Sequence, residues 1–356
     1  MLRLRFGLAA LLGVAVLAGS ARADLTSSLK KQSVNLQSAS ALAFGPESIL
    51  FIGDSAAATI YAVATGDQAT GDKKAAMNVE GIDKLVADML GATPKDIAIS
   101  AMKVNPATGN VYLAVRRAKG PGAAIFRVDR TGKVTELALK DIPAASVQLP
   151  NASEKQRAQS ITCMAFSKDR LFVAGLSNEE FASTLRSLPF PFQQADKGSG
   201  IEIYHGSHGR FETASPIRTF TLFDVSGQAS LLAAYTCTPL VRIPVESLKP
   251  GEKVKGATVA ELGNGNTPLD MVVYQKDGKT YILMANTKRG VMKIQTEGIE
   301  GTEPITKRVS DKAGLKYETV TDLKNVEKLD RLNDTMAVVL MSGENGSQML
   351  KSVALP

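Results

Sequence analysis

Asp54 and Asn286 are the residues whose types and positions best suit metal chemistry. Each directly follows a short apolar segment, where a side chain can reach the rim of a sheet. Carboxylate and amide oxygens are the ligands that Ca²⁺ prefers, so we retain both residues as candidate metal ligands, with Ca²⁺ as the candidate cofactor. The alternative is that both side chains cap turns through hydrogen bonds to the backbone.

A wider ligand site is predicted around these two residues. Arg116 and Arg289 could each bind an anionic group through paired hydrogen bonds, or lie in solvent as ordinary loop charges. Asp270 would bring a second carboxylate, and its convergence with Asp54 and Asn286 would favour a metal-dependent enzyme. The predicted ligand-binding residues at the rim are Asp54, Arg116, Asn178, Cys237, Asp270, Asn286 and Arg289. No catalytic residue is assigned.

Cys163 and Cys237 are the only cysteines in the chain. An oxidising compartment lets such a pair persist as a disulfide, and we predict either a Cys163–Cys237 disulfide or two buried thiols. As a free thiol, Cys237 could also bind copper or act as a redox centre. With no Cys-x-x-Cys motif, covalent c-type haem and cysteine-rich zinc sites are excluded.

His205 and His208 are the only histidines, in the sequence His-Gly-Ser-His-Gly. A turn could bring both imidazoles to one metal ion, but the glycines favour an exposed turn. A Ser-His-Asp triad would have to use one of them, and the chain has no Gly-x-Ser-x-Gly elbow. Serine hydrolysis is therefore disfavoured.

The first 23 residues have the three parts of a secretory signal. Arg3 and Arg5 precede an apolar run over residues 6–18, and Ala-Arg-Ala at 21–23 is a cleavage pattern. The run is shorter than the roughly 20 residues needed to cross a bilayer, and no later segment approaches that length. We expect a protein exported to the periplasm or secreted, with one domain over residues 24–356 and no membrane span.

The charge distribution excludes one class of partner. The formal net charge is +7, and part of it lies in the predicted signal. A nucleic-acid-binding protein is expected to show a concentrated basic stripe or stacking aromatic side chains, and neither is visible in the sequence. The expected partner is a protein or a small molecule.

A repeated phrase indicates the elements that must position these residues. A strand of large apolar residues, ending in Gly or Ala in five of six copies, recurs at intervals of roughly 50–60 residues. The copies are residues 50–53, 111–114, 171–174, 231–234, 282–285 and 338–341. Such continuous apolar runs between turn signals are typical of strands buried on both faces.

The flanks of each phrase complete a propeller blade. Another apolar run and a turn precede most copies, and an alternating strand follows, so each repeat reads as an antiparallel meander. Because one meander cannot bury both faces, neighbours must stack radially. We predict an all-β fold, a single β-propeller of about six blades, with seven as the alternative count. The segment 33–38 is expected to pair with the last strand, 348–353, and close the ring.

Two stretches of the sequence depart from the repeat. Apolar residues at 82, 85, 86, 89 and 90 have helical spacing and predict a short helical insertion. Residues 178–200 contain Leu-Pro-Phe-Pro-Phe at 188–192, where the prolines forbid regular strand pairing. This second stretch is the first candidate for a contact surface.

The first repeat carries a family resemblance. Ala-Leu-Ala-Phe-Gly-Pro at 41–46, followed by residues 50–54 and 60–63, resembles a repeat of the NHL or SMP-30/gluconolactonase-like six-bladed propellers. That resemblance implies the fold, whereas the superfamily includes lactonases, lyases, protein-binding scaffolds and subunits of redox assemblies. Its calcium-dependent enzymes carry an acidic residue at an early strand, but Glu47 falls in the turn after the first strand here.

The leading functional hypothesis is an exported binding or scaffold protein, accessory to an envelope or redox enzyme complex. It rests on a complete blade repeat without a recognisable catalytic constellation. The alternative is a metal-dependent enzyme of the lactonase or lyase type, with its site at the channel rim.

Overall fold

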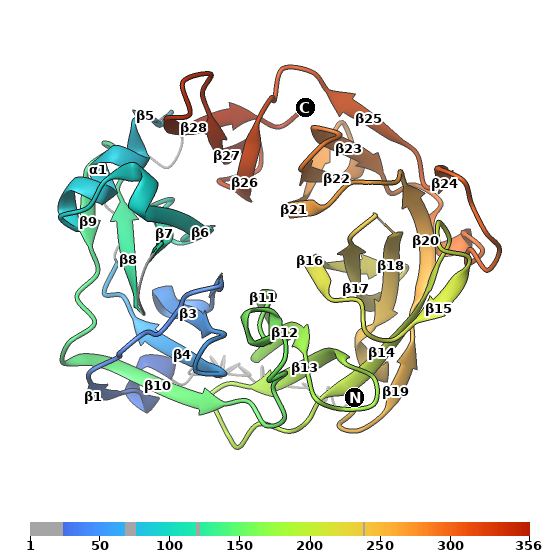
Figure 1. Ribbon diagram of the computed structural model, residues 1–356, viewed down its shortest axis with the longest axis horizontal. Helices are drawn as coiled ribbons and strands as arrows, with labels where there is room; N and C mark the ends of the chain where they lie inside the picture. Colours follow the sequence, from blue (N-terminus) through green and yellow to red (C-terminus); the bar gives the residue numbers. More distant parts are fainter. Residues whose placement is uncertain (1–23, 68–75, 119–121, 238) are drawn as a thin grey trace, which may run out of the picture.

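Six antiparallel meanders surround a central axis in the computed structural model, which describes residues 24–67, 76–118, 122–237 and 239–356 (Figure 1). The predicted signal peptide, residues 1–23, lies outside the described residues. The prediction of an all-β propeller is confirmed, with six blades and one short α-helix.

Each blade is numbered here by its order along the chain. Blade 1 contains β2 (Ala41–Phe44), β3 (Ile49–Asp54) and β4 (Thr59–Ala64). Blade 2 contains β6 (Ile97–Val104), β7 (Val111–Arg117), β8 (Ala123–Val128) and β9 (Val134–Glu136). Blade 3 contains β11 (Cys163–Ser167), β12 (Arg170–Leu176), β13 (Ser183–Pro189), β14 (Ser199–His205) and β15 (Arg210–Glu212). Blade 4 contains β16 (Ile217–Val225), β17 (Gln228–Tyr235), β18 (Pro239–Pro244), β20 (Ala257–Leu262) and β24 (Lys312–Gly314). Blade 5 contains β21 (Pro268–Lys276), β22 (Lys279–Asn286), β23 (Val291–Gln295) and β25 (Tyr317–Val320). Blade 6 contains β26 (Val326–Arg331), β27 (Met336–Ser342) and β28 (Gln348–Ala354).

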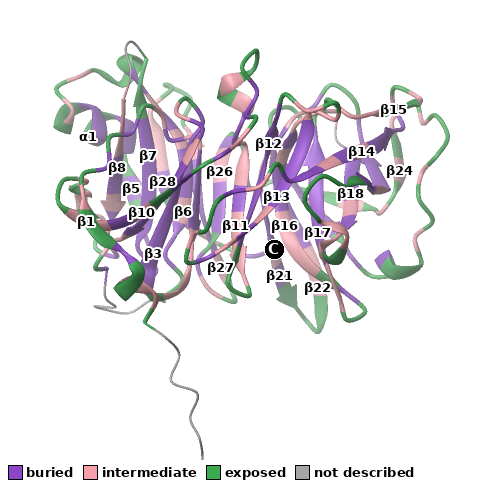
Figure 2. Cartoon of the chain, turned by 90° about the horizontal axis from the view of Figure 1, so that it is seen from below, coloured by how far each residue is buried: buried purple, intermediate pink, exposed green. Residues whose placement is uncertain are grey.

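The six predicted phrases are the second strands of the six blades: β3, β7, β12, β17, β22 and β27. Their apolar side chains are buried, and buried residues follow the strands while exposed residues gather at the loops (Figure 2). Gly53 shows why a phrase ends in a small residue. A Cβ added at Gly53 would lie only 2.7 Å from Ile161 Cγ2 of the segment leading into blade 3.

The order of the blades around the ring differs from their order in the chain. The inner strand β2 contacts both β6 and β11, and β26 contacts both β21 and β6. The ring therefore runs blade 2, 1, 3, 4, 5, 6 and back to blade 2 (Figure 1). Blades 1 and 2 have exchanged places relative to a ring built in chain order.

Outer strands from distant parts of the chain secure this exchange. After blade 1, β5 (Asn78–Glu80) pairs with β28 of blade 6, and after blade 2, β10 (Ile142–Gln148) pairs with β4 of blade 1. Further out, β1 (Lys30–Gln32) pairs with β10, and β19 (Lys253–Lys255) pairs in parallel with β14. The expectation that residues 33–38 pair with the last strand is wrong, because β5 occupies that edge.

The proline-rich stretch is part of the scaffold. Residues Ser183–Pro189 form β13, the third strand of blade 3, so the predicted interruption there is wrong: Pro189 stands at the strand end, opposite Arg170. Beyond it, Phe190 and Phe192 pack edge-on against Phe51 of blade 1 at 5.0 and 5.8 Å between ring centroids. This aromatic contact joins blade 3 to blade 1, and each such pair contributes about 0.5–1.5 kcal/mol beyond area burial.

The predicted helix is confirmed as α1 (Ile82–Met89). It buries Ile82 and Val86 and leaves Leu85 and Met89 on its outer face. Within the described ranges, no helix is long and apolar enough to span a membrane.

Candidate functional site

A chamber of about 210 Å³ occupies the central channel. All six inner strands line it, and each contributes one residue that pairs with the last residue of its blade's phrase or, in blade 6, with the residue before it, Leu340. These residues are Ala41, Ala101, Cys163, Thr219, Asp270 and Lys328. Blades 1 and 2 thus supply alanines at this level. Blades 3 to 6, which are adjacent in the ring, supply a thiol, a hydroxyl, a carboxyl and an amine. We call this cavity the channel chamber.

Strand bulges increase the number of side chains that face the chamber. The register shifts by one residue in β6, β16, β21 and β26, and three of the extra residues, Ser100, Arg218 and Leu269, line the chamber. A bulge re-aims side chains and bends the strand. As a result, consecutive residues such as Arg218 and Thr219 both line the chamber.

A half-buried ion pair lies between the chamber and a wider opening of about 670 Å³ at the other end of the channel. Lys103 Nζ on blade 2 lies 3.1 Å from Asp330 Oδ1 on blade 6, and Asp330 Oδ2 accepts a hydrogen bond from the Val104 N–H at 2.8 Å. Burial by itself would lower the pKa of Lys103, but the charges of Asp330 and Asp270 outweigh burial and raise it. Lys103 is therefore a cation held in the channel.

Asp270 lines the chamber, and its carboxyl has a raised pKa. Its Oδ2 accepts a hydrogen bond from the Leu329 N–H at 3.2 Å. Burial raises the pKa of Asp270, and the neighbouring cations Lys328 and Lys103 offset only part of that effect. The Asp270 carboxyl therefore keeps its proton to a higher pH than an exposed aspartate does.

Cys163 also belongs to the chamber. Its Sγ lies 3.9 Å from both Thr219 Oγ1 and the carbonyl oxygen of Phe220. Burial raises the pKa of the Cys163 thiol, although Lys103 opposes the shift. Because the thiolate is the reactive form of cysteine, Cys163 is suited to packing in the chamber more than to attack on a substrate.

The two candidate metal ligands lie on different blades and are engaged in turns. The fully buried Asp54 accepts hydrogen bonds from the Gln37 N–H at 2.7 Å and from the Ser38 N–H and hydroxyl at 3.0 and 2.8 Å. On blade 5, Asn286 Oδ1 accepts from Asn266 Nδ2 at 2.9 Å. Of the predicted trio, Asp270 lines the chamber, while Asp54 and Asn286 are not among the described residues that do. Calcium binding at these two residues stays a prediction.

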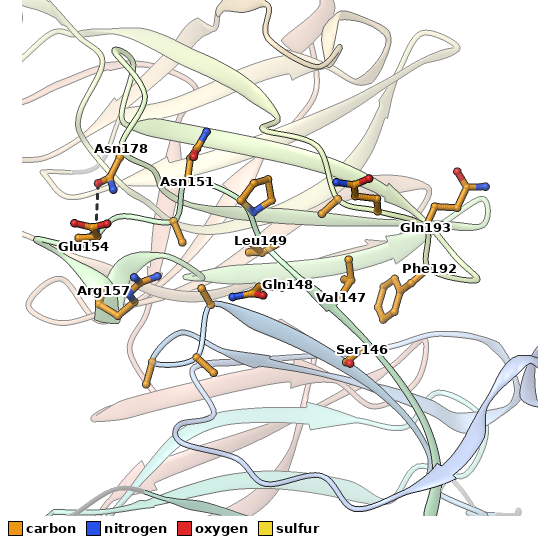
Figure 3. Close-up of a pocket in the computed structure, with 17 residues that line it drawn as sticks. Ser146, Val147, Gln148, Leu149, Asn151, Glu154, Arg157, Asn178, Phe192 and Gln193 are labelled. Atoms are coloured by element: carbon orange, nitrogen blue, oxygen red, sulfur yellow. Dashed lines mark hydrogen bonds between the residues drawn. The ribbon is translucent and has the colours of Figure 1, made fainter.

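The other predicted residues are also dispersed. Arg116 is exposed at the end of β7, and Arg289 forms an ion pair with Asp311 at 2.8 Å. Asn178 lies on an open groove of about 830 Å³ between blades 1 and 3, where its Oδ1 accepts from the Glu154 N–H at 3.2 Å (Figure 3). Amide side chains such as Gln148 and Gln193 line much of this groove. We favour the channel chamber as the functional site, because it gathers half-buried charged groups from several blades.

The predicted disulfide is not formed, because Cys163 and Cys237 are both free thiols. Cys163 lies in the channel on blade 3, whereas Cys237 lies in the turn after β17, beside His205 and His208. Of the alternative prediction, two buried thiols, the free thiols are present, but both residues are half-buried.

Several channel residues were not predicted from the sequence: Lys103, Arg218, Thr219 and Lys328, which line the chamber, and Asp330, which lines the wider opening. The predicted rim lay one residue beyond each phrase, on the second strand, but the channel is lined by the first strand. A usable signal was present for Lys103, which stands between two apolar residues in Met-Lys-Val. A charge at such a position needs a partner.

Comparisons with known proteins add little to this geometry. No protein-family model and no curated protein matches the chain. Among solved structures, a putative glucose dehydrogenase of Thermus thermophilus is 13% identical with a TM-score of 0.39, covering 91% of this chain and 100% of that one. The PQQ-bound aldose sugar dehydrogenase of Streptomyces coelicolor is 12% identical with a TM-score of 0.36, covering 91% and 96%. A streptogramin B lyase is 10% identical with a TM-score of 0.31, covering 92% and 97%. At these values the likeness carries no argument about function.

Proposed function

We propose that the protein binds a small molecule with an anionic group in the channel chamber. The observation that carries this proposal is the surplus of positive charge there. Lys103, Arg218 and Lys328 all line the chamber. Against them stand Asp330, which is paired with Lys103, and Asp270, whose pKa is raised by burial.

Arg218 supports the same ligand chemistry. Its Nε is buried and has no hydrogen-bond partner among the described residues. A guanidinium binds carboxylate or phosphate groups through paired hydrogen bonds, and leaving a buried donor unpaired costs about 1–3 kcal/mol. The chamber, at about 210 Å³, is smaller than the roughly 300–1,000 Å³ of pockets for drug-sized ligands. A compact anion fits both constraints.

A ligand screen tests this proposal directly. The purified chain is scanned for thermal stabilisation by small carboxylates, phosphate and neutral sugars, and hits are measured by calorimetry. Lys328→Met should weaken an anion about 10–100-fold, since a hydrogen bond to a charged group is worth about 1.5–3 kcal/mol. Arg116→Met removes an exposed cation outside the chamber and is the matched control. Failure of every anion to stabilise the protein, or equal effects of the two variants, would contradict the proposal.

Export is part of the proposal. The charged, apolar and small-residue segments within residues 1–23 support secretion of this binding protein to the periplasm or beyond. N-terminal sequencing of protein recovered outside the cytoplasm should begin at Asp24. Recovery of the intact N-terminus in the cytoplasm would contradict export.

The second candidate is an enzyme of the lyase or lactonase type, favoured by Asp270. A half-buried carboxyl with a raised pKa beside two lysines is a common arrangement for general acid–base catalysis. Mass spectrometry of a ligand found by the screen, before and after incubation, distinguishes the two functions. Turnover that Asp270→Asn abolishes while binding persists would establish the enzyme, and an unchanged ligand would leave the binding protein.

A further inference from the structure

Two histidines and a cysteine come together on the outer part of the propeller, away from the channel-lining strands. His205 ends β14 of blade 3, and His208 lies in the turn that follows. Cys237 lies in the turn between β17 and β18 of blade 4, two strands labelled on the right of Figure 1. One ring nitrogen of each histidine and the Cys237 Sγ lie within 4.8 Å of one another. We call these three residues the edge cluster.

One carboxylate fixes the orientation of both imidazoles. His205 Nδ1 lies 2.9 Å from Glu212 Oε2, and His208 Nδ1 lies 2.6 Å from Glu212 Oε1. Ser215 donates its hydroxyl to the same carboxylate, which keeps Glu212 an acceptor. Both histidines therefore carry their proton on Nδ1 and present the lone pair of Nε2. Donation of the second ring N–H to a carboxylate is how proteins orient metal-binding histidines.

The Nε2 atom of His205 needs a partner that the described residues do not supply. The His205 side chain is 3% exposed, and its Nε2 has no hydrogen-bond partner among the described residues. The two rings face each other at 3.8 Å between centroids with a tilt of 34°, and both turn Nδ1 toward Glu212. The Nε2 atom of each ring is therefore not the nitrogen that Glu212 engages. A buried acceptor of this kind is costly unless something binds it.

The backbone holds the third member in place. Cys237 has φ of 61°, a left-handed conformation that is uncommon for a residue with a Cβ. Its N–H donates to the carbonyl oxygen of Asn266 at 2.8 Å, which anchors the turn to the loop before blade 5. The histidine turn is anchored as well, because Gly206 donates its N–H to Glu261 Oε1 of blade 4 at 2.6 Å. Two separately fixed turns thus bring the thiol and the imidazoles together.

We propose that the edge cluster binds a borderline transition-metal ion such as Zn²⁺ through His205 Nε2, His208 Nε2 and Cys237 Sγ. Imidazole and thiolate ligands suit such ions, whereas Ca²⁺ and Mg²⁺ prefer oxygen. Glu212 is a positioning residue that sets the tautomer of both histidines. Three protein ligands leave a fourth position for water or an external ligand, as in zinc sites that exchange ligands.

Cobalt is the probe that reports thiolate ligation directly. The full-length protein is stripped with a chelator, reduced and titrated with Co²⁺, and the spectrum is followed as Zn²⁺ is added. One Co²⁺ per chain should bind with a thiolate-to-cobalt charge-transfer band, and Zn²⁺ should remove that band stoichiometrically. Added Ca²⁺ should leave the spectrum unchanged.

Variants separate this site from adventitious binding. Cys237→Ser should abolish the charge-transfer band, and Cys163→Ser, the same change at the chain's other thiol, should keep it. His208→Ala, at a side chain that is 42% exposed and so tolerant of truncation, should weaken binding beyond the roughly 10–100-fold expected for Glu212→Gln. Far-ultraviolet circular dichroism confirms that each variant is folded. A wild-type protein without a stoichiometric band, or a band that survives Cys237→Ser, would overturn the proposal.

Discussion

The channel and the edge cluster both contain titratable side chains shielded from solvent, but the two regions differ in how these side chains are hydrogen-bonded and paired. In the channel, Lys103 and Asp330 neutralise each other at 3.1 Å, and Asp270 accepts a backbone N–H. In the edge cluster, Glu212 engages one nitrogen of each imidazole, and the other nitrogen of His205 has no partner among the described residues. The channel charges thus help to hold the blades together, whereas the edge cluster keeps its lone pairs for a ligand.

Removing a channel cation should have the largest effect on folding. Lys103→Met leaves Asp330 buried without its partner and should cost about 3 kcal/mol, the lower end of the range for breaking a buried ion pair. Urea unfolding measures the loss. The double variant Lys103→Met/Asp330→Asn removes both charges, keeps an acceptor for the Val104 N–H and should be more stable than the single variant. A single variant as stable as the wild type would show that the pair does not stabilise the channel.

Adding a metal should affect the edge cluster and leave the channel as it is. At 100 times its dissociation constant, a ligand that binds only the folded state adds about 2.7 kcal/mol to the free energy of unfolding. Zn²⁺ should produce this increase in the wild type and in Asp270→Asn, but not in Cys237→Ser. Equal stabilisation of all three proteins would place the metal elsewhere.

The pH dependence of stability should identify Asp270 as an unfavourable charge in the channel. Its folded-state pKa is raised above the ordinary value, so the folded protein binds the proton more tightly than the unfolded chain does. The contribution of Asp270 to stability therefore falls as pH rises from its ordinary pKa, near 3.9, through its raised folded-state pKa. The groups facing it are Lys328, Lys103 and Asp330.

Asp270→Asn should remove this part of the pH dependence and be the more stable protein at neutral pH. Urea unfolding at a series of pH values, starting near pH 4, measures the difference between variant and wild type. A difference that stays constant across the series would contradict the raised pKa.

The smallest expected effect is the coupling between the two regions. Among the described residues, the hydrogen bonds and ion pairs of the channel pair involve none of the residues that hold the edge cluster. Independent sites add within about 0.3–0.5 kcal/mol. The losses caused by Lys103→Met and Cys237→Ser, measured without metal, should therefore sum in the double variant. Coupling above about 1 kcal/mol would mean that the two regions communicate through blades 3 and 4.

The local pattern of apolar residues was sufficient to predict the second strand of each blade. Six apolar phrases predicted six second strands, and helical spacing around Val86 predicted α1, because strand and helix periodicity depends on neighbours within a few residues. The same local reading placed Asp270 at a ligand site, and the structure puts it in the channel chamber. It also singled out Cys237 and noted the spacing of the two histidines, without connecting them.

Tertiary structure decided the ring and the sites. The pairing of β5 with β28 joins residues near 80 to residues near 350, and no local pattern encodes which edge a short strand will choose. The exchange of blades 1 and 2 depends on such pairings and on the contact of Phe190 with Phe51. Bulges in the inner strands turned Arg218 and Asp270 toward the channel, and two turns from different blades brought Cys237 to the histidines. Local sequence determines which segments are strands, but charge pairing and metal-ligand geometry arise only when distant strands meet.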